Sequence, residues 1–155
     1  MKIYRIAGKK HINDLTGTGA KITGGRWNPK GLPVIYTAAN SSLAILETLV
    51  HTDIDLIPDD LYIAEIIIEA KFTKYKIDIN DLPKNWDIHP GPDSLKEIGK
   101  LWLTKNEFLV FQVPSAVNPL EYNYLINPVH KEFSKVRITK IFPAGIDKRL
   151  RTKRK

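Results

Sequence analysis

The stretch Gly24-Gly25-Arg26-Trp27-Asn28-Pro29-Lys30-Gly31 organises the rest of this chain. It places an arginine between paired glycines, which permit backbone conformations that other residues resist, and a Trp-Asn-Pro turn. The planar guanidinium of Arg26 offers several donors in a fixed arrangement that suits phosphate or carboxylate groups. The loop is therefore a candidate element for binding an anion.

A strand and a helix are predicted directly after this loop. The run from Leu32 to Ala38 is typical of a strand, and Tyr36 lies within it. The Asn-Ser-Ser sequence at 40–42 supplies good N-cap residues for a helix. The predicted loop, strand and helix each carry one polar residue of interest: Arg26, Tyr36 and Glu47. The three lie within about one supersecondary unit.

The position of Glu47 on this helix leaves two interpretations open. On a helical wheel Glu47 falls just outside the apolar arc of the helix. That arc contains Leu43, Leu46, Leu49 and Val50, with Ile45 at its edge. Glu47 is then either an ordinary exposed glutamate or a carboxylate at the rim of the core that points into a cleft.

The size and composition of the chain are those of an ordinary globular protein. Its 155 residues favour a single domain with a real core, and hydrophobic residues make up 43% of it. No apolar run approaches the roughly 18 residues of a membrane span, and the first residues lack the apolar core of a signal peptide. The chain has no cysteine, which excludes disulfides and thiolate metal sites. These features predict a cytoplasmic protein with no membrane association.

Positive charge is concentrated at the C-terminal end. The formal net charge is +7, and the run Lys148-Arg149-Leu150-Arg151-Thr152-Lys153-Arg154-Lys155 is almost entirely basic. Such a run is either a solvated, disordered tail or a weak contact to nucleic acid or a partner protein. A nucleic-acid reader would need base-contacting or stacking groups beside the charge, and we find no such motif. Direct binding of nucleic acid is therefore not expected.

The order of the predicted elements indicates an α+β fold with mostly antiparallel sheets and flanking helices. Strands are expected at residues 2–6, 32–38, 61–70, 107–113, 122–126 and 136–142. A helix capped by Asp93 or Ser94 is expected to run to about Lys105, with Leu95, Ile98, Leu101 and Trp102 facing inward. The long loop at 8–31 is expected to contain one helical turn near 12–15. Residues 77–79 predict a short strand or turn, and residues 80–93 a surface excursion.

Several familiar motifs do not fit this sequence. The glycines before Arg26 lack the Gly-Lys-Ser/Thr ending of a P-loop, and Gly17-x-Gly19 neither follows a strand directly nor opens a helix as in a dinucleotide-binding fold. The four histidines are dispersed without zinc-ligand spacing, so no metal is expected. Ser115 does not lie on a nucleophile elbow, and taken alone it is a turn serine at the end of a predicted strand.

Four segments together resemble the RES domain, a family named for an arginine, a glutamate and a serine in its motifs. They are the glycine-rich loop 24–31, the strand and helix from Val34 to Glu47, the Val-Pro-Ser segment within 113–118, and the Asn-Pro-Val-His stretch within 125–130. They occur in the order typical of the family, and the likeness extends from Tyr4 to about Ile141. We therefore expect one RES-like domain at 1–147 and a basic tail at 148–155.

The resemblance implies a bacterial toxin of a type II toxin–antitoxin pair, with a fold similar to ADP-ribosyltransferase toxins. Members of the family consume NAD by hydrolysis or phosphorolysis of the nicotinamide–ribose bond, and some are reported to transfer ADP-ribose to a protein. Their partner is a helix-turn-helix antitoxin that blocks the NAD pocket. A homodimer within the toxin–antitoxin complex is compatible with this resemblance.

The resemblance also implies the site. The matching residues are Arg26, Tyr36, Glu47 and Ser115, with Trp27 and Asn118 as neighbours. Arg26 would pair with the diphosphate or anchor a ribose, and Tyr36 would stack on nicotinamide. Glu47 would stabilise the oxocarbenium-like ribose or orient a nucleophile, and Ser115 would bind the nicotinamide amide or fix Glu47. Two alternatives remain, a protein ADP-ribosyltransferase and a basic nucleic-acid- or protein-binding module without catalysis.

Overall fold

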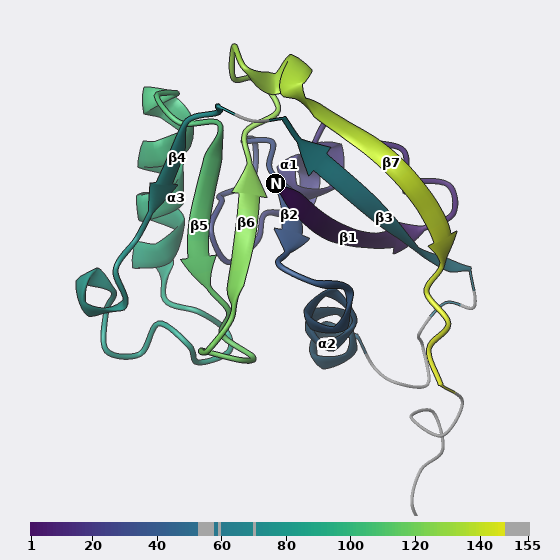
Figure 1. Ribbon diagram of the computed structural model, residues 1–155. Coiled ribbons are helices and arrows are strands. Elements are labelled where there is room, and N and C mark those ends of the chain that lie inside the picture. The colour runs from purple at the N-terminus through teal and green to yellow at the C-terminus, as the bar shows by residue number, and fades with distance from the viewer. Residues whose placement is uncertain (53–57, 59, 70, 148–155) are drawn as a thin grey trace, which may run out of the picture.

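The computed structural model describes residues 1–52, 58, 60–69 and 71–147, so the predicted tail at 148–155 lies outside the described part. Within that part, strands form one seven-stranded sheet in the order β4-β5-β6-β2-β1-β3-β7 (Figure 1). They are β1 (Lys2–Gly8), β2 (Ile35–Ala38), β3 (Leu61–Ile68), β4 (Lys74–Lys76), β5 (Val110–Pro114), β6 (Tyr122–Ile126) and β7 (Val136–Pro143). All neighbouring pairs are antiparallel except β4 and β5, which confirms the predicted α+β fold.

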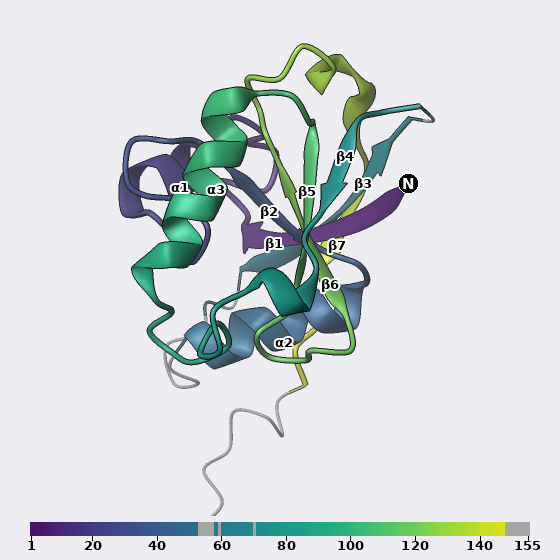
Figure 2. The same ribbon diagram turned by 90° about the vertical axis from the view of Figure 1, so that its left-hand side faces the viewer.

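Helices cover one face and one end of this sheet. They are α1 (Thr18–Thr23), α2 (Ser41–His51) and α3 (Asp93–Lys105), with short 3-10 helices η2 (Ile79–Asp81) and η3 (Phe133–Lys135). Helix α3 lies along the half formed by β4, β5 and β6, and α2 packs against β1 and β2 (Figure 2). None of the helices in the described ranges combines the length and apolar character needed to cross a bilayer.

Strand β5, second from one edge of the sheet, is buried along its whole length between two hydrophobic clusters. On one side Phe111 packs against Trp102 of α3 and meets the edge of the Trp27 ring, at centroid distances of 5.3 and 5.6 Å. On the other side Val110 belongs to a cluster with Ile3 and other apolar side chains of β1, β2, β3 and β6. Because both faces of β5 are covered, polar groups gather at the two ends of the strand.

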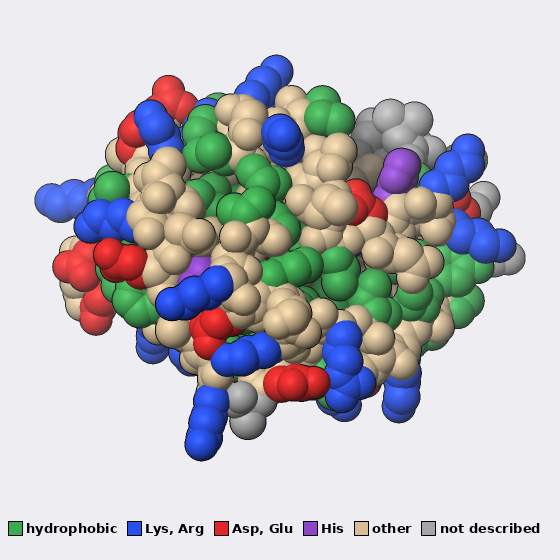
Figure 3. All heavy atoms as spheres, turned by 90° about the horizontal axis from the view of Figure 1, so that it is seen from above, with side chains coloured by type: hydrophobic (Ala, Val, Ile, Leu, Met, Phe, Trp, Pro, Cys, Tyr) green, Lys and Arg blue, Asp and Glu red, His purple; other side chains and the backbone are tan. Residues whose placement is uncertain are grey.

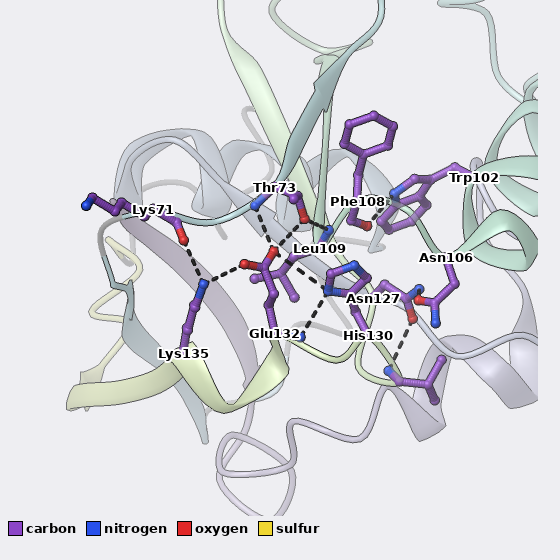
Figure 4. Close-up of polar contacts among 11 residues, drawn as sticks. Lys71, Thr73, Trp102, Asn106, Phe108, Leu109, Asn127, His130, Glu132 and Lys135 are labelled. Carbon is purple, nitrogen blue, oxygen red and sulfur yellow. Dashed lines mark hydrogen bonds and ion pairs between the residues drawn. The ribbon is translucent and has the colours of Figure 1, made fainter.

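One of these ends carries a polar network centred on Glu132 (Figure 4). Oε2 of Glu132 accepts hydrogen bonds from N and Oγ1 of Thr73 at 2.8 and 2.6 Å, and Oε1 binds Nζ of Lys135. Oγ1 of Thr73 accepts from N of Leu109, and Nδ1 of His130 accepts from N of Glu132. The bond from Lys135, followed by those from Thr73, lowers the pKa of Glu132 to about 2. The network ties the starts of β4, β5 and β7 together.

The loop at 8–31 differs from its prediction. The helical turn predicted near 12–15 is wrong, because the structure has turns at residues 9–13 and places helix α1 at 18–23. Gly17 is the N-cap of this helix with φ of 71°, so Gly17-x-Gly19 opens a helix, contrary to the prediction. A Cβ at Gly17 would lie 2.7 Å from N of Val34. A hydrogen bond of 2.8 Å from N of Gly31 to O of Lys21 ties α1 to the following loop. Tertiary contacts of this kind hold the helix in place. Its six residues show no periodic apolar pattern from which a helix could be predicted.

Helix α2 is confirmed, but its predicted apolar arc is buried only in part: Leu43 is buried, and Ile45 and Leu49 pack against a core cluster. Leu43 and Ala44 are buried, whereas Leu46 and Val50 are 39% and 54% exposed. Oδ1 of Asn40 caps the helix by accepting a hydrogen bond from N of Leu43. Because Glu47 follows Leu43 by four residues, it lies on the same side of the helix and turns toward the sheet.

Helix α3 is also confirmed, with two corrections. It begins at Asp93 itself, with Pro92 in the N-cap position, and Leu101 is 55% exposed although it was predicted to face inward. Gly99 faces the loop at 24–31, and a Cβ there would lie 1.7 Å from O of Trp27. The missing side chain lets α3 approach the backbone of the loop at 24–31 directly.

The remaining differences concern element ends and the segment before α3. β2 begins at residue 35 and β5 at residue 110, each three residues later than predicted, and β3 ends at residue 68. The strand expected near 77–79 lies at 74–76 and is followed by η2. The segment 80–93 is more than a surface excursion, because Trp86 is buried in the cluster beneath α3.

Candidate functional site

A cavity of about 950 Å³ opens where α2 meets the ends of β2, β5 and β6. Its wall includes the loop at 24–30, the middle of β1 (residues 4–6) and residues 89–91. Four of the predicted site residues are among its lining residues: Arg26, Trp27, Tyr36 and Glu47. Ser115 and Asn118 do not line it, and they lie just behind the wall, next to the end of β5. In the described part of the chain, no group of three or more His, Asp or Glu side chains is arranged to hold a metal ion.

Glu47 is fixed through one of its two carboxylate oxygens. Oε1 accepts a hydrogen bond of 2.7 Å from Oγ of Ser115 and one of 2.5 Å from Nδ2 of Asn123. Oε2 lies 3.6 Å from Nε2 of His51, one helical turn later. The side chain is 21% exposed, so the carboxylate reaches the cavity, whereas Ser115, one of its two anchors, is fully buried.

Ser115 acts on Glu47 from beneath the wall. Its residue is completely buried, and its Oγ donates to Glu47 while accepting from N of Val117 and N of Asn118 at 3.1 and 3.0 Å. This geometry corresponds to the second of its two expected roles, the fixing of Glu47. Asn118 contributes its backbone to this turn, and its side-chain Oδ1 accepts a hydrogen bond of 3.4 Å from N of Leu120.

Arg26, another residue of the cavity wall, is bound to the backbone of the segment before α3. Its Nη1 donates to O of Trp86 at 2.7 Å and to O of Ile88 at 3.0 Å. A Cβ on Gly91 would lie 2.7 Å from the same Nη1, so the backbone at 91 passes directly over the guanidinium. A guanidinium has five N–H donors, and these two contacts use only one of its nitrogens. The remaining donors stay on the wall of the cavity.

Tyr36 and Asn28 lock the glycine-rich loop in place. Oη of Tyr36 donates to Oδ1 of Asn28 at 2.8 Å and accepts from N of Trp27 at 3.1 Å. Nδ2 of the fully buried Asn28 donates to O of Ala20 and O of Leu32. A Cβ on Gly25 would lie 2.5 Å from the Tyr36 hydroxyl, so glycine is required at this position. Burial raises the pKa of Tyr36, which keeps its hydroxyl protonated as a donor.

The structure also places residues in the site that sequence reasoning missed. Arg5, Asn123, His51 and His89 all line the cavity. Nη1 of Arg5 donates to O of Asp14, and burial lowers the pKa of Arg5. The signal for His51 was its spacing of four residues from Glu47 on one helix. Asn123 and His89 carried no local signal, because their places follow from strand pairing and from the path of the segment before α3.

The chain is similar to known proteins along nearly its whole length. The family model of the RES domain matches residues 2–147. A protein named Toxin Res from Photorhabdus laumondii is 37% identical over 152 residues, which cover 97% of each chain. A Toxin Res from Yersinia enterocolitica is 40% identical over 134 residues, covering 86% of this chain and 88% of the relative.

Two further proteins extend the comparison. A Prs ADP-ribosylating toxin from Sphingobium is 36% identical over 131 residues, covering 83% of this chain and 81% of that protein. The crystal structure of the M. tuberculosis MbcT–MbcA toxin–antitoxin complex contains a chain that matches with a TM-score of 0.75 and 20% identity, covering 97% of this chain and 88% of that chain. The latter match shows a shared fold. From the family match over residues 2–147 and these identities, the chain belongs to the RES domain family.

Proposed function

We propose that this protein is the toxin of a toxin–antitoxin pair and that it cleaves the nicotinamide–ribose bond of NAD. The observation that carries the proposal is the carboxylate of Glu47, anchored by Ser115 and Asn123 at the wall of a cavity that Arg26 and Tyr36 also line. The names of the similar proteins, Toxin Res and Prs ADP-ribosylating toxin, support it.

The charges of the cavity suit NAD as a substrate. Arg26 and Arg5 line it and offer guanidinium groups to the anionic diphosphate. Departure of neutral nicotinamide takes the electron pair of the glycosidic bond and leaves positive charge on the ribose. Oε2 of Glu47, which carries no hydrogen bond from Ser115 or Asn123, stabilises that positive charge and accepts a hydrogen bond from a ribose hydroxyl. An incoming oxygen nucleophile then bonds to the same ribose carbon.

The acceptor decides between the reactions that remain. Water would give ADP-ribose, phosphate would give ADP-ribose 1″-phosphate, and a protein side chain would give an ADP-ribosylated protein. The third possibility is supported by the Sphingobium relative, whose name describes an ADP-ribosylating toxin. All three use the same bond cleavage, and therefore the same role for Glu47.

An antitoxin is the proposed protein partner. The match to a chain of the MbcT–MbcA complex supports a toxin–antitoxin pairing, and a helix-turn-helix antitoxin and a homodimer remain part of the proposal. A non-catalytic basic module has less support. On the face seen from above, lysines and arginines are spread among acidic and apolar side chains and form no single patch (Figure 3).

The proposal is tested by incubating the purified protein with NAD, with and without phosphate, beside Glu47→Ala. The wild type is expected to release nicotinamide and the variant to release none while remaining folded by circular dichroism. The second product identifies the acceptor. Equal nicotinamide release by both proteins, or none by the wild type with either acceptor or with a bacterial protein extract, would refute the proposal.

A further inference from the structure

Two histidines meet at the end of the cavity that contains Glu47. His51 comes from the last turn of α2 and His89 from the segment before α3, and both line the cavity. Their ring centroids are 5.4 Å apart with an interplanar angle of 49°. Neither residue belongs to the motifs from which the site was predicted.

The two oxygens of Glu47 have unequal surroundings. Oε1 accepts two hydrogen bonds, from Ser115 and Asn123, whereas Oε2 has Nε2 of His51 at 3.6 Å. One anchored oxygen leaves the carboxylate plane free to turn about that point. A second contact, at Oε2, is needed to set the direction in which its lone pairs face the cavity.

His51 is well placed to supply this second contact. Residues four apart on a helix lie on the same face, so the backbone of α2 holds His51 beside Glu47. The 3.6 Å separation is only slightly longer than a hydrogen bond, and a small rotation of either side chain closes it.

His89 supports His51 from the other side. The carbonyl of its neighbour Ile88, together with that of Trp86, accepts hydrogen bonds from Arg26. Arg26 therefore fixes the segment that brings the His89 ring against His51. A continuous line of contacts joins Arg26 to Glu47 through the two histidines.

We propose that His51 is a positioning residue that orients Oε2 of Glu47 toward the ribose, with His89 restricting the imidazole from behind. The inference rests on the proposed NAD cleavage and adds to it two residues that contribute to turnover through Glu47. Loss of His51 should therefore affect the cleavage step more than the binding of NAD.

Steady-state kinetics of His51→Ala, His51→Gln and Val50→Ala test the inference. Glutamine carries an amide donor at about the same reach as Nε2, and Val50 is exposed on the same turn of α2 without lining the cavity. We expect His51→Ala to lower kcat about tenfold with KM for NAD within about twofold, because misplaced reacting groups slow chemistry. His51→Gln should recover most of this loss, and Val50→Ala should match the wild type. An unchanged kcat in His51→Ala, or no recovery in His51→Gln, would overturn the inference.

A second measurement needs no turnover, and so separates this inference from the proposed function. In protein with ¹⁵N-labelled histidine, the ring signals of wild type and Glu47→Gln are compared in the absence of NAD. The signals of His51 and His89 should move, whereas those of His11 and His130, which lie outside the cavity, should stay in place. Identical His51 signals in the two proteins would show that the contact with Glu47 does not form.

Discussion

Glu47 and Glu132 lie near opposite ends of β6, and each is the centre of a polar network, but the two networks differ in how fully they occupy the carboxylate. Glu132 receives partners on both oxygens, from Thr73 and Lys135 (Figure 4). Glu47 receives two neutral donors on one oxygen, while its other oxygen has His51 at 3.6 Å. A lysine neutralises the first carboxylate directly, and no lysine or arginine in the described residues is paired with the second at ion-pair distance.

The comparison separates a structural carboxylate from one that is available for chemistry. A carboxylate with all its partners supplied by the protein stabilises the fold and has little capacity left for a ligand. A carboxylate anchored through one oxygen keeps lone pairs for a substrate while its position stays fixed. Four changes test this difference, in order of decreasing expected effect.

Shortening the Glu47 side chain should have the largest effect. Glu47→Asp keeps the charge but withdraws the carboxylate by one methylene, away from Ser115 and Asn123. We expect kcat for nicotinamide release to fall about 100-fold, with KM for NAD nearly unchanged, because a displacement of this size disrupts a reactive geometry. Wild-type turnover in this variant would show that the anchored position of the carboxylate is unimportant.

Removing the anchor beneath the wall should have a smaller effect on turnover and a measurable one on stability. Ser115→Ala deletes a donor to Glu47 and leaves two backbone N–H groups without their acceptor. We expect kcat to fall about tenfold and the free energy of unfolding in urea to fall by about 1–3 kcal/mol. Ser94→Ala, at an exposed position on α3, is the matched control and should change neither quantity. Unchanged stability and turnover in Ser115→Ala would contradict this role.

A methyl group at Gly91 should disturb Arg26 alone. The new Cβ would lie 2.7 Å from Nη1, at the end of a flexible side chain, so the guanidinium can move aside without unfolding the protein. We predict that Gly91→Ala raises KM for NAD about fivefold, roughly 1 kcal/mol of binding, and hardly changes the melting temperature. Gly19→Ala is the control, because a Cβ there meets nothing within 4 Å. Equal KM values for the two variants would remove Arg26 from the binding site.

Lowering the pH should destabilise the folded protein through protonation of Glu132. The folded-state pKa is lowered from 4.5 to about 2, so the stability gained from this network is fully present above about pH 4.5. It is lost as the pH falls toward 2, where the folded carboxylate takes up its proton. Glu132→Gln should therefore show a shallower loss of stability between pH 4.5 and 2 than the wild type in thermal unfolding. Parallel curves for the two proteins would contradict the assigned pKa.

Much of the sheet could be predicted from sequence because its strands are apolar in a simple period. The strands around Ile3, Ile66 and Leu125 were found in this way, and so was α2 with its cap at Asn40. Helix α1 was not predicted, since its short sequence has no apolar face and its ends are held by loop contacts. The inward face of α2 was predicted only in part, because Ala44 and Glu47, which also turn inward, are not the residues that hydrophobicity favours.

The site residues likewise differ in how far sequence could predict them. Arg26, Tyr36 and Glu47 follow one another closely in the chain, so local patterns and a family resemblance indicated them together. Ser115, which lies 68 residues from Glu47 in sequence, was indicated by the family resemblance alone. Asn123, 76 residues from Glu47, was not predicted, because only strand pairing brings the two together. His89 reaches the cavity because Arg26 binds backbone carbonyls of its segment, a contact that no residue pattern announces.

The most direct test of this account compares Glu47→Gln with Glu132→Gln under identical conditions at neutral pH. Each variant removes one charge and keeps the shape of the side chain, and both nicotinamide release and melting temperature are measured. We predict that Glu47→Gln loses turnover and keeps its melting temperature, whereas Glu132→Gln melts several degrees lower and keeps its turnover while folded. Loss of turnover in folded Glu132→Gln to the same degree as in Glu47→Gln, or normal turnover in Glu47→Gln, would contradict it.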